Sequence, residues 1–192
     1  MRHYRAFHHA ERVFDQARAS SELELRQFDF TAADVERIQR LLSVLFYPYR
    51  ALRAKPATLK SNRKGQSGLW PFAISGDHPI LLAYVGEKDE LALINDLLNA
   101  HAYWRNRHIK VDLVILNLQD TGYSLELQNR LHRLIARTSG DAWLNRRGGI
   151  FTLQVDQLNS EDLTLLETAA RAILDGRKGS LDDQLKPLTQ HN

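Results

Sequence analysis

Hydrophobic positions along this chain follow two different periods. Short apolar runs occupy residues 79–85, 111–117 and 149–155, and the first two are nearly continuous. Such runs are typical of strands that are covered on both faces. Between and after them, apolar residues recur every three or four positions, which predicts helices. This part of the chain therefore reads as β-α-β-α-β-α, with parallel strands and right-handed crossovers.

Each of these three helices has a recognisable start and an apolar stripe. Asp89 can cap the first helix, Ser124 can cap the second, and the third begins at Ser160. The stripes consist of Leu91, Ile94, Leu97, Leu98 and Trp104 in the first helix, Leu127, Leu131, Leu134 and Ile135 in the second, and Leu163, Leu166, Ala169, Ala170 and Ile173 in the third. The strand order, 2-1-3 or 1-2-3, stays open.

Two further helices are predicted before the strands. Residues 4–24 place apolar side chains at helical spacing, and a second helix starts near Thr31, where Thr31 and Asp34 have the form of a capping box. That helix ends before Pro48. With the order 1-2-3, both crossover helices lie on one face and this helical pair could cover the other. We expect an α/β fold, a three-stranded parallel sheet with an N-terminal helical pair packed on it.

These elements divide the chain into four parts. Residues 1–54 form the helical pair and residues 79–175 the α/β module. Residues 55–78 are a linker and the loop before the first strand, because residues 55–69 are rich in Lys, Ser, Gly and Asn and have no period. Residues 176–192 are a C-terminal tail.

Composition narrows the possible classes of protein. The 192 residues are 43% hydrophobic and 26% charged, an ordinary globular mixture. The chain has no cysteine, which excludes disulfides, thiolate metal sites and cysteine nucleophiles. Its net charge of +3 is spread among interleaved acids and bases, so it is weak evidence for nucleic-acid binding. The start carries charge throughout, and no window approaches a membrane span, so we expect a soluble segment without direct membrane contact.

Motifs for familiar chemistries are missing. The loop after the first strand, residues 86–89, lacks the glycine series that brings a backbone close to a pyrophosphate, and the chain has no P-loop. Neither a G-x-S-x-G elbow nor an H-E-x-x-H zinc motif occurs. We expect no cofactor, no metal site and no catalytic residue in this segment.

Two loops offer polar groups for a carbohydrate. The loop after the second strand contributes Asn117 and Tyr123, and the loop before the first strand contributes Ser75, Asp77 and His78. A structural interpretation is favoured for both loops, because Asn can end a strand while Gly and Asp are common in turns.

Four residues are assigned structural roles. Trp70 and Phe72 are expected to fill the junction between the helical pair and the sheet, Gly76 to form the turn before the first strand, and Trp104 to lie in the core.

Several segments resemble one region of the cyclic β-1,2-glucan synthases. They are GQSGLWPFAISGDHPILL, LNAHAYWRNRHIKVDLVILN, Tyr123 with Leu127-Gln128, and the Gly148–Phe151 start of the last strand. The stretches around residues 26–28 and 45–54 are similar to the sequence just upstream in the same proteins. The resemblance covers nearly the whole chain.

The resemblance implies an internal, non-catalytic module of a bacterial inner-membrane synthase. Such synthases are family 84 glycosyltransferases that build cyclic glucan from UDP-glucose, and their C-terminal modules are related to family 94 phosphorylases. The implied place of this region is the cytoplasmic side, among those C-terminal modules, between β-sandwich segments and a helical barrel. Its implied partners are these neighbours and β-glucan.

Two alternatives remain from the residues alone. A small stand-alone enzyme or sugar-binding domain would need a concave pocket at the strand ends. A nucleic-acid-binding module would need its basic residues on one face. Those residues are Arg63, Lys64, Arg105, Arg107, Arg146 and Arg147.

Overall fold

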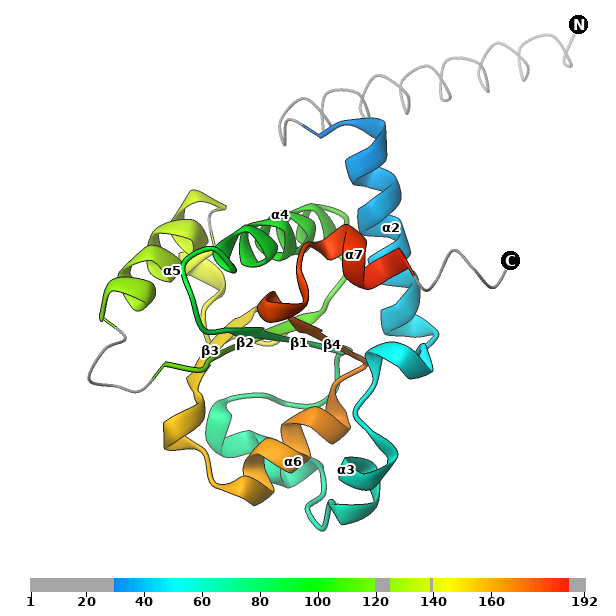
Figure 1. The fold of residues 1–192 in the computed structure, drawn as a ribbon, viewed down its shortest axis with the longest axis vertical. Coiled ribbons are helices and arrows are strands. Elements are labelled where there is room, and N and C mark those ends of the chain that lie inside the picture. The colour runs from blue at the N-terminus through cyan, green and yellow to red at the C-terminus, as the bar shows by residue number, and fades with distance from the viewer. Residues whose placement is uncertain (1–29, 120–124, 139, 187–192) are drawn as a thin grey trace, which may run out of the picture. The chain divides into compact units, whose positions relative to one another are not determined.

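The computed structural model describes residues 30–119, 125–138 and 140–186 (Figure 1). The chain divides into two compact units, residues 1–38 and 39–192. The helix predicted over residues 4–24 lies outside the described residues, and the next one, α2 (Ala32–Phe46), is confirmed. So is its capping box, in which the Asp34 amide donates to Thr31 Oγ1 at 3.2 Å and the Thr31 amide donates to Asp34 Oδ2 at 2.9 Å.

The second unit is built on a parallel sheet of four strands. These are β1 (Ile80–Val85), β2 (Asp112–Asn117), β3 (Ile150–Gln154) and β4 (Ala172–Asp175), arranged in the order β3-β2-β1-β4. The predicted strands and their parallel pairing are confirmed, and they follow the order 1-2-3. The prediction of a three-stranded sheet was wrong, because β4 adds a strand beside β1.

Strand β4 was missed because it was read as the end of the last helix. That helix, α6 (Ser160–Ala169), stops before Ala170, and the Arg171 amide then donates to the carbonyl oxygen of Ile80 at 2.8 Å. Ile173, assigned to the apolar stripe of the helix, lies in the new strand. A run of four residues is too short for its period to distinguish strand from helix.

The place of β4 determines which face each helix covers. From β1 to β3 the chain moves in one direction across the sheet, and α4 (Leu91–Asn106) and α5 (Leu125–Arg137) cover one face. It then returns past two strands to reach β4, so a right-handed crossover places α6 on the opposite face (Figure 1). This face had been expected to receive the N-terminal helical pair.

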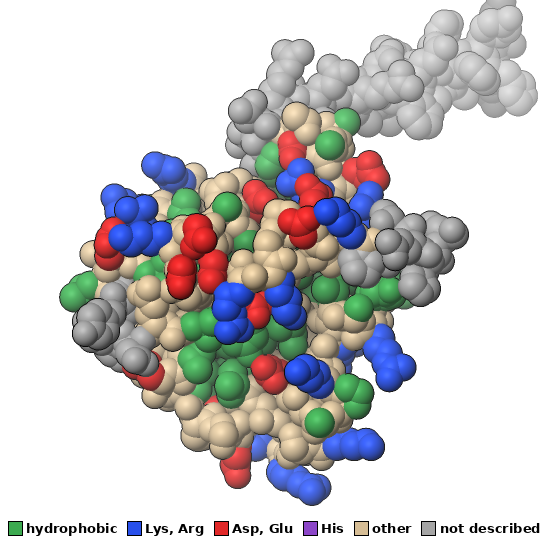
Figure 2. Space-filling model, in the orientation of Figure 1, with side chains coloured by type: hydrophobic (Ala, Val, Ile, Leu, Met, Phe, Trp, Pro, Cys, Tyr) green, Lys and Arg blue, Asp and Glu red, His purple; other side chains and the backbone are tan. Residues whose placement is uncertain are grey.

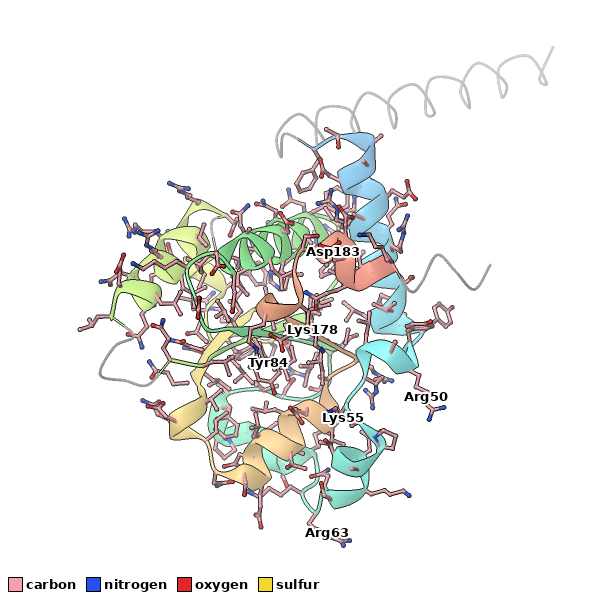
Figure 3. The ribbon with its side chains drawn as sticks, in the orientation of Figure 1. Arg50, Lys55, Arg63, Tyr84, Lys178 and Asp183 are labelled. Carbon is pink, nitrogen blue, oxygen red and sulfur yellow. The ribbon has the colours of Figure 1, made fainter. Side chains whose placement is uncertain are left out.

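The face under α6 forms a continuous apolar core. Tyr84 on β1 lies within it and donates its hydroxyl proton to Glu167 Oε1 on α6 at 2.6 Å (Figure 3). The buried members of this core are Leu69, Ile74, Ile80, Leu82, Tyr84, Val114, Leu116, Phe151, Leu165, Leu166 and Ala170. Leu69 comes from the segment that had been expected to be a linker, and Ile74 comes from the loop before the first strand.

The supposed linker and tail both contain ordered elements. The linker forms α3 (Pro56–Ser61) and the 3-10 helix η2 (Gln66–Phe72), and both pack on α6. The tail forms α7 (Leu181–Leu185), whose two leucines are buried. Shorter 3-10 turns complete the fold: η1 (Arg50–Leu52), η3 (Asp141–Trp143), η4 (Val155–Gln157) and η5 (Gly176–Lys178).

The role expected for Trp70 was wrong. Its side chain is 64% exposed, whereas its neighbour Leu69 is 2% exposed and sits in the core. Both lie in η2, and consecutive side chains of a 3-10 helix point about 120° apart, so only one of the two can face the sheet. Phe72 is partly buried against the same core, and Trp104 is buried.

This difference predicts losses of stability of different size for two adjacent substitutions. Leu69→Ala should lower the free energy of unfolding by about 2–5 kcal/mol, because it leaves a cavity under α6. Trp70→Ala should cost less than about 1 kcal/mol, because most of the indole is already in solvent. Urea denaturation of the two variants measures both values. A loss at Trp70 as large as that at Leu69 would contradict the placement of η2.

Candidate functional site

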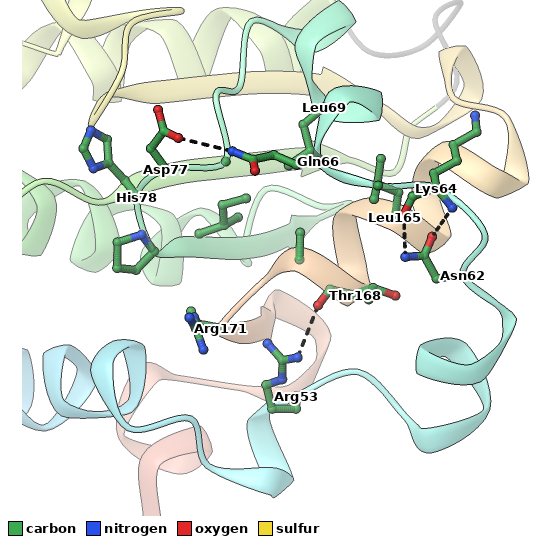
Figure 4. A pocket seen from close by; sticks show the side chains of 15 residues that line it. Arg53, Asn62, Lys64, Gln66, Leu69, Asp77, His78, Leu165, Thr168 and Arg171 are labelled. Carbon is green, nitrogen blue, oxygen red and sulfur yellow. Dashed lines mark hydrogen bonds between the residues drawn. The ribbon is translucent and has the colours of Figure 1, made fainter.

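A cavity lined by both charged and aliphatic side chains opens at the amino end of β1, on the face that α6 covers. Its volume is about 510 Å³, and its walls come from four segments that are distant in the sequence (Figure 4). Its lining residues are Arg53, Asn62, Lys64, Gly65, Gln66, Leu69, Gly76, Asp77, His78, Pro79, Ile80, Leu165, Thr168, Ala169 and Arg171. The cavity thus gathers two of the predicted carbohydrate-binding residues, Asp77 and His78.

A tight turn presents these two residues to the cavity. Gly76 has a φ of 76°, and a Cβ at this position would lie 2.8 Å from Gln66 Cγ, so both the backbone conformation and the close approach require glycine. The Ser75 hydroxyl accepts a hydrogen bond from the Asp77 amide at 3.3 Å. Gln66, the first residue of η2, donates to the Ser75 carbonyl oxygen at 2.8 Å and so links the turn to η2.

The Asp77 carboxylate bonds to side chains rather than to the turn's backbone. Its Oδ1 accepts from Gln66 Nε2 at 3.2 Å, and its Oδ2 pairs with the Arg147 guanidinium. In the structural interpretation of this loop, an Asp side chain in a turn commonly accepts hydrogen bonds from the backbone amides of the turn. The Ser75 hydroxyl takes that role because it lies within reach of the Asp77 amide.

Two arginines form the opposite wall of the cavity. The Arg53 guanidinium donates to the carbonyl oxygens of Ala170 and, at 3.2 Å, Thr168. These are carbonyls at the C-terminal end of α6, where a cation is favourable. Arg171 begins the turn from α6 into β4 and lines the cavity beside Arg53. Burial lowers the pKa of Arg53, and the positive charge of Arg171 lowers it further.

The other predicted binding residues lie elsewhere. Asn117 ends β2, at the carboxyl edge of the sheet, whereas Asp77 and His78 precede β1 at the amino edge. In a parallel sheet these are opposite ends, so Asn117 does not converge on one site with Asp77 and His78. Asn117 is buried, and its Oδ1 accepts from the Gln119 amide at 2.9 Å. Tyr123 lies outside the described residues.

Many α/β proteins bind ligands at the carboxyl edge of the sheet. In this protein β1 and β4 are paired neighbours, and the loops after them begin at Gly86 and Gly176. Glu90 lies between these two loops, because its Oε2 accepts from the Gly86 amide at 2.6 Å and a Cβ on Gly176 would lie 2.5 Å from Glu90 Cβ. Glu90 also takes the N-cap position of α4 that had been expected for Asp89, without a side-chain capping bond.

Polar groups at the end of β4 are paired internally. The Arg177 guanidinium donates to both oxygens of Asp175, at 2.9 Å from Nε and 2.7 Å from Nη2. Gln184 on α7 accepts from the Asp175 amide at 2.9 Å. The amino-edge cavity is therefore the better candidate for a binding site.

Comparison with known proteins supplies the context for this geometry. No model of a known protein family matches the chain. The chain is 32% identical over 194 residues to the cyclic beta-(1,2)-glucan synthase NdvB of Rhizobium meliloti (strain 1021), and the match covers 98% of the chain. This confirms the resemblance to a cyclic glucan synthase. The chain spans about 7% of the length of NdvB, so the match concerns one small region of a much longer protein.

Four of the six basic residues named for a nucleic-acid-binding module make intramolecular contacts. The Lys64 ammonium pairs with Asp162 at 2.7 Å and Glu161 at 3.4 Å, and Arg147 pairs with Asp77. Arg105 lies over the ring of Trp143, and Arg107 lies over the ring of Tyr103. Acidic and basic side chains are interspersed on the visible face of the molecule (Figure 2).

Two further properties concern the described residues only. Within residues 30–119, 125–138 and 140–186, no group of three or more His, Asp or Glu side chains could hold a metal ion. None of the helices in the same ranges combines the length and the apolar character that a bilayer crossing requires.

Sequence reasoning missed most of the cavity wall. Arg53 was placed at the end of the helical pair, Asn62 and Gln66 in the linker, and Arg171 inside the last helix. Only the return of the chain to β4, and the folding of η2 onto α6, bring these residues together. No local motif marks them.

Buried polar groups lie behind the amino edge of the sheet. Asp112, at the start of β2, is fully buried, and its Oδ1 accepts from the Gly148 amide at 2.7 Å. Burial raises the pKa of Asp112. His101 on α4 is also buried, with its Nε2 2.9 Å from the Val111 carbonyl oxygen. Burial lowers the pKa of His101 to about 4, and the charge of Arg105 adds to this effect.

His101 should make folding sensitive to mild acid. Its pKa is below the ordinary value of 6.5, so below pH 6.5 the unfolded chain binds a proton that the folded chain excludes until about pH 4. This residue should therefore lower the free energy of unfolding by about 2 kcal/mol between about pH 7 and pH 5.

His101→Gln keeps a donor for the Val111 carbonyl and removes the titration. Denaturant unfolding of both proteins at the two pH values isolates the contribution of the imidazole. The native chain should lose more stability on acidification than the variant. Equal losses would show that the imidazole is not held neutral in the core.

Proposed function

We propose that this chain is a non-catalytic module of a cyclic β-1,2-glucan synthase that packs against neighbouring modules of the same polypeptide. In this proposal the parent protein is an inner-membrane enzyme that builds cyclic glucan from UDP-glucose. This region lies on its cytoplasmic side, next to β-sandwich and helical-barrel modules. The observation that carries the proposal is the 32% identity to NdvB across 98% of the chain.

The arrangement of polar groups supports a role without catalysis. An acid and a base that act on one substrate must reach the same reacting atoms. Here Asp77 and His78 lie at the amino edge of the sheet, whereas Asn117 lies at the carboxyl edge. Glu90 packs between the loops that follow β1 and β4. Asp77 is held by Gln66 and Arg147 in an exposed turn.

Exposed apolar side chains support the packing role. Phe46 and Tyr47, at the end of α2, are 54% and 82% exposed, and Trp70 on η2 projects into solvent. Aromatic side chains on a surface are a recurrent feature of interfaces, where they bury large areas. In a longer polypeptide, the neighbouring modules are the surfaces available to cover them.

The absence of catalysis can be tested in the full-length protein that contains this chain. Asp77→Asn and His78→Gln together should leave the rate of cyclic glucan formation from UDP-glucose within about twofold of the native rate, since loss of a general acid or base lowers rates by roughly 10²–10⁴-fold. Glucan formation in isolated membranes measures this rate. A fall of roughly a hundredfold, with unchanged amounts of folded protein, would place catalysis in this module.

The packing role is tested by comparing one variant in two contexts. Phe46→Ser with Tyr47→Ser should change the melting temperature of the 192-residue chain little, because the side chains are already largely exposed. In the full-length protein the same pair should expose this region to limited proteolysis. Lys55→Ser, an exposed change nearby, is the control. Equal protease resistance of the native and variant full-length proteins would contradict the packing role.

A further inference from the structure

The charges that line the amino-edge cavity do not cancel. Three cationic side chains, Arg53, Lys64 and Arg171, face one carboxylate, Asp77. Lys64 is neutralised from outside the cavity by Asp162 and Glu161. Asp77 is likewise paired with Arg147, so it is not available to the arginines. The uncompensated charge therefore resides on Arg53 and Arg171.

Neither arginine has an acidic partner in the part of the chain that the structure describes. The hydrogen bonds of Arg53 go to the backbone carbonyls of Thr168 and Ala170, which are neutral groups. Arg171 makes no ion pair with any described residue. The two guanidinium groups approach the same space from different elements, Arg53 after η1 and Arg171 before β4 (Figure 4). An anion bound between them would relieve their mutual repulsion.

The rest of the lining favours a small anion over a neutral sugar ring. Leu69, Ile80, Leu165 and Ala169 provide an aliphatic floor, and no Phe, Tyr or Trp is among the residues that line the cavity. A pyranose ring would lack the face of a Phe, Tyr or Trp ring on which to stack, whereas guanidinium groups match the geometry of phosphoryl oxygens and bind them bidentately. At about 510 Å³ the cavity has the size of a small-molecule site and exceeds what a bare phosphate ion fills.

We propose that this cavity binds the phosphoryl group of a small soluble phosphate ester between the guanidinium groups of Arg53 and Arg171. The body of the ester would lie toward Asn62 and Gln66, whose side chains edge the same cavity. Binding would join the end of α6, the start of β4 and the segment after η1 through one ligand. The residues of the cavity alone support this binding, whether or not the chain is part of a glucan synthase.

The first test uses inorganic phosphate and methyl phosphate with the 192-residue chain. Both should bind with saturation in calorimetry, and two-dimensional NMR should show the largest shifts at the Nε–H signals of Arg53 and Arg171. Sodium chloride at the same ionic strength should not reproduce these shifts. Absence of saturable binding at millimolar concentrations, or an equal response to chloride, would overturn the proposal.

Matched arginine variants locate the site. Arg171→Ala removes an exposed side chain and should weaken phosphate binding by about tenfold or more. Arg63→Ala is the control, since Arg63 points away from the fold in Figure 3 and does not line the cavity. Arg53→Lys keeps a cation near the end of α6 but loses the parallel N–H donors of the guanidinium, so it should also weaken binding. Unchanged affinity in Arg171→Ala would rule out this cavity.

Two further ligands test whether the cavity prefers a soluble phosphate ester to a neutral sugar or to a phosphate headgroup in a membrane. A neutral β-1,2-linked glucose disaccharide should cause no shifts at the arginines. Phosphatidylcholine vesicles that contain phosphatidic acid should bind no better than vesicles without it. Binding of the disaccharide that Arg171→Ala abolishes, or binding confined to the acidic vesicles, would contradict the assignment of a small phosphate ester.

Discussion

The pairing of β4 with β1 is the constraint on which the rest of the structure depends. Strands β1 to β3 and their helices would leave one face of the sheet uncovered. By returning to β1, the chain must cross the opposite face, and α6 then covers it. The hydrogen bond from the Arg171 amide to the Ile80 carbonyl marks the point where the crossover ends and the new strand begins.

The same pairing creates the cavity and its charge. It places Arg171 next to the start of β1, where the Gly76 turn presents Asp77 and His78. The end of α6 lies at this edge too, and Arg53 reaches it from the segment after η1. In this arrangement Arg53 caps the C-terminal end of α6, and neither Arg53 nor Arg171 has an acidic partner among the described residues. The carboxyl edge differs, because Arg177 pairs with Asp175 there and Glu90 accepts from the Gly86 amide.

Much of the α/β module follows from the sequence. The apolar runs around Leu82, Val114 and Phe151 are long enough to identify buried strands, and the capping box at Thr31 marks the start of α2. Local patterns fail where tertiary contacts decide. Residues 172–175 become a strand only because the edge of β1 is available to them, and Leu69 rather than Trp70 is buried because of how η2 sits on α6.

The candidate site was predictable only in part. Asp77 and His78 were identified because a turn before a buried strand brings polar side chains to an edge of the sheet. Their partners could not be identified, since Arg53, Gln66 and Arg171 are brought to the cavity by contacts between distant segments. Asn117 was grouped with the binding residues on its chemistry, although its position at the end of a parallel strand places it at the other edge.

Nuclear Overhauser effects along residues 170–175 test the central claim most directly. Pairing of β4 with β1 predicts cross-strand contacts between the backbones of Leu82 and Ile173 and of Ala83 and Leu174, together with slow exchange of the Arg171 amide. A continuous series of amide–amide contacts from α6 through Ile173, without any contact to β1, would contradict the four-stranded sheet and the cavity that depends on it.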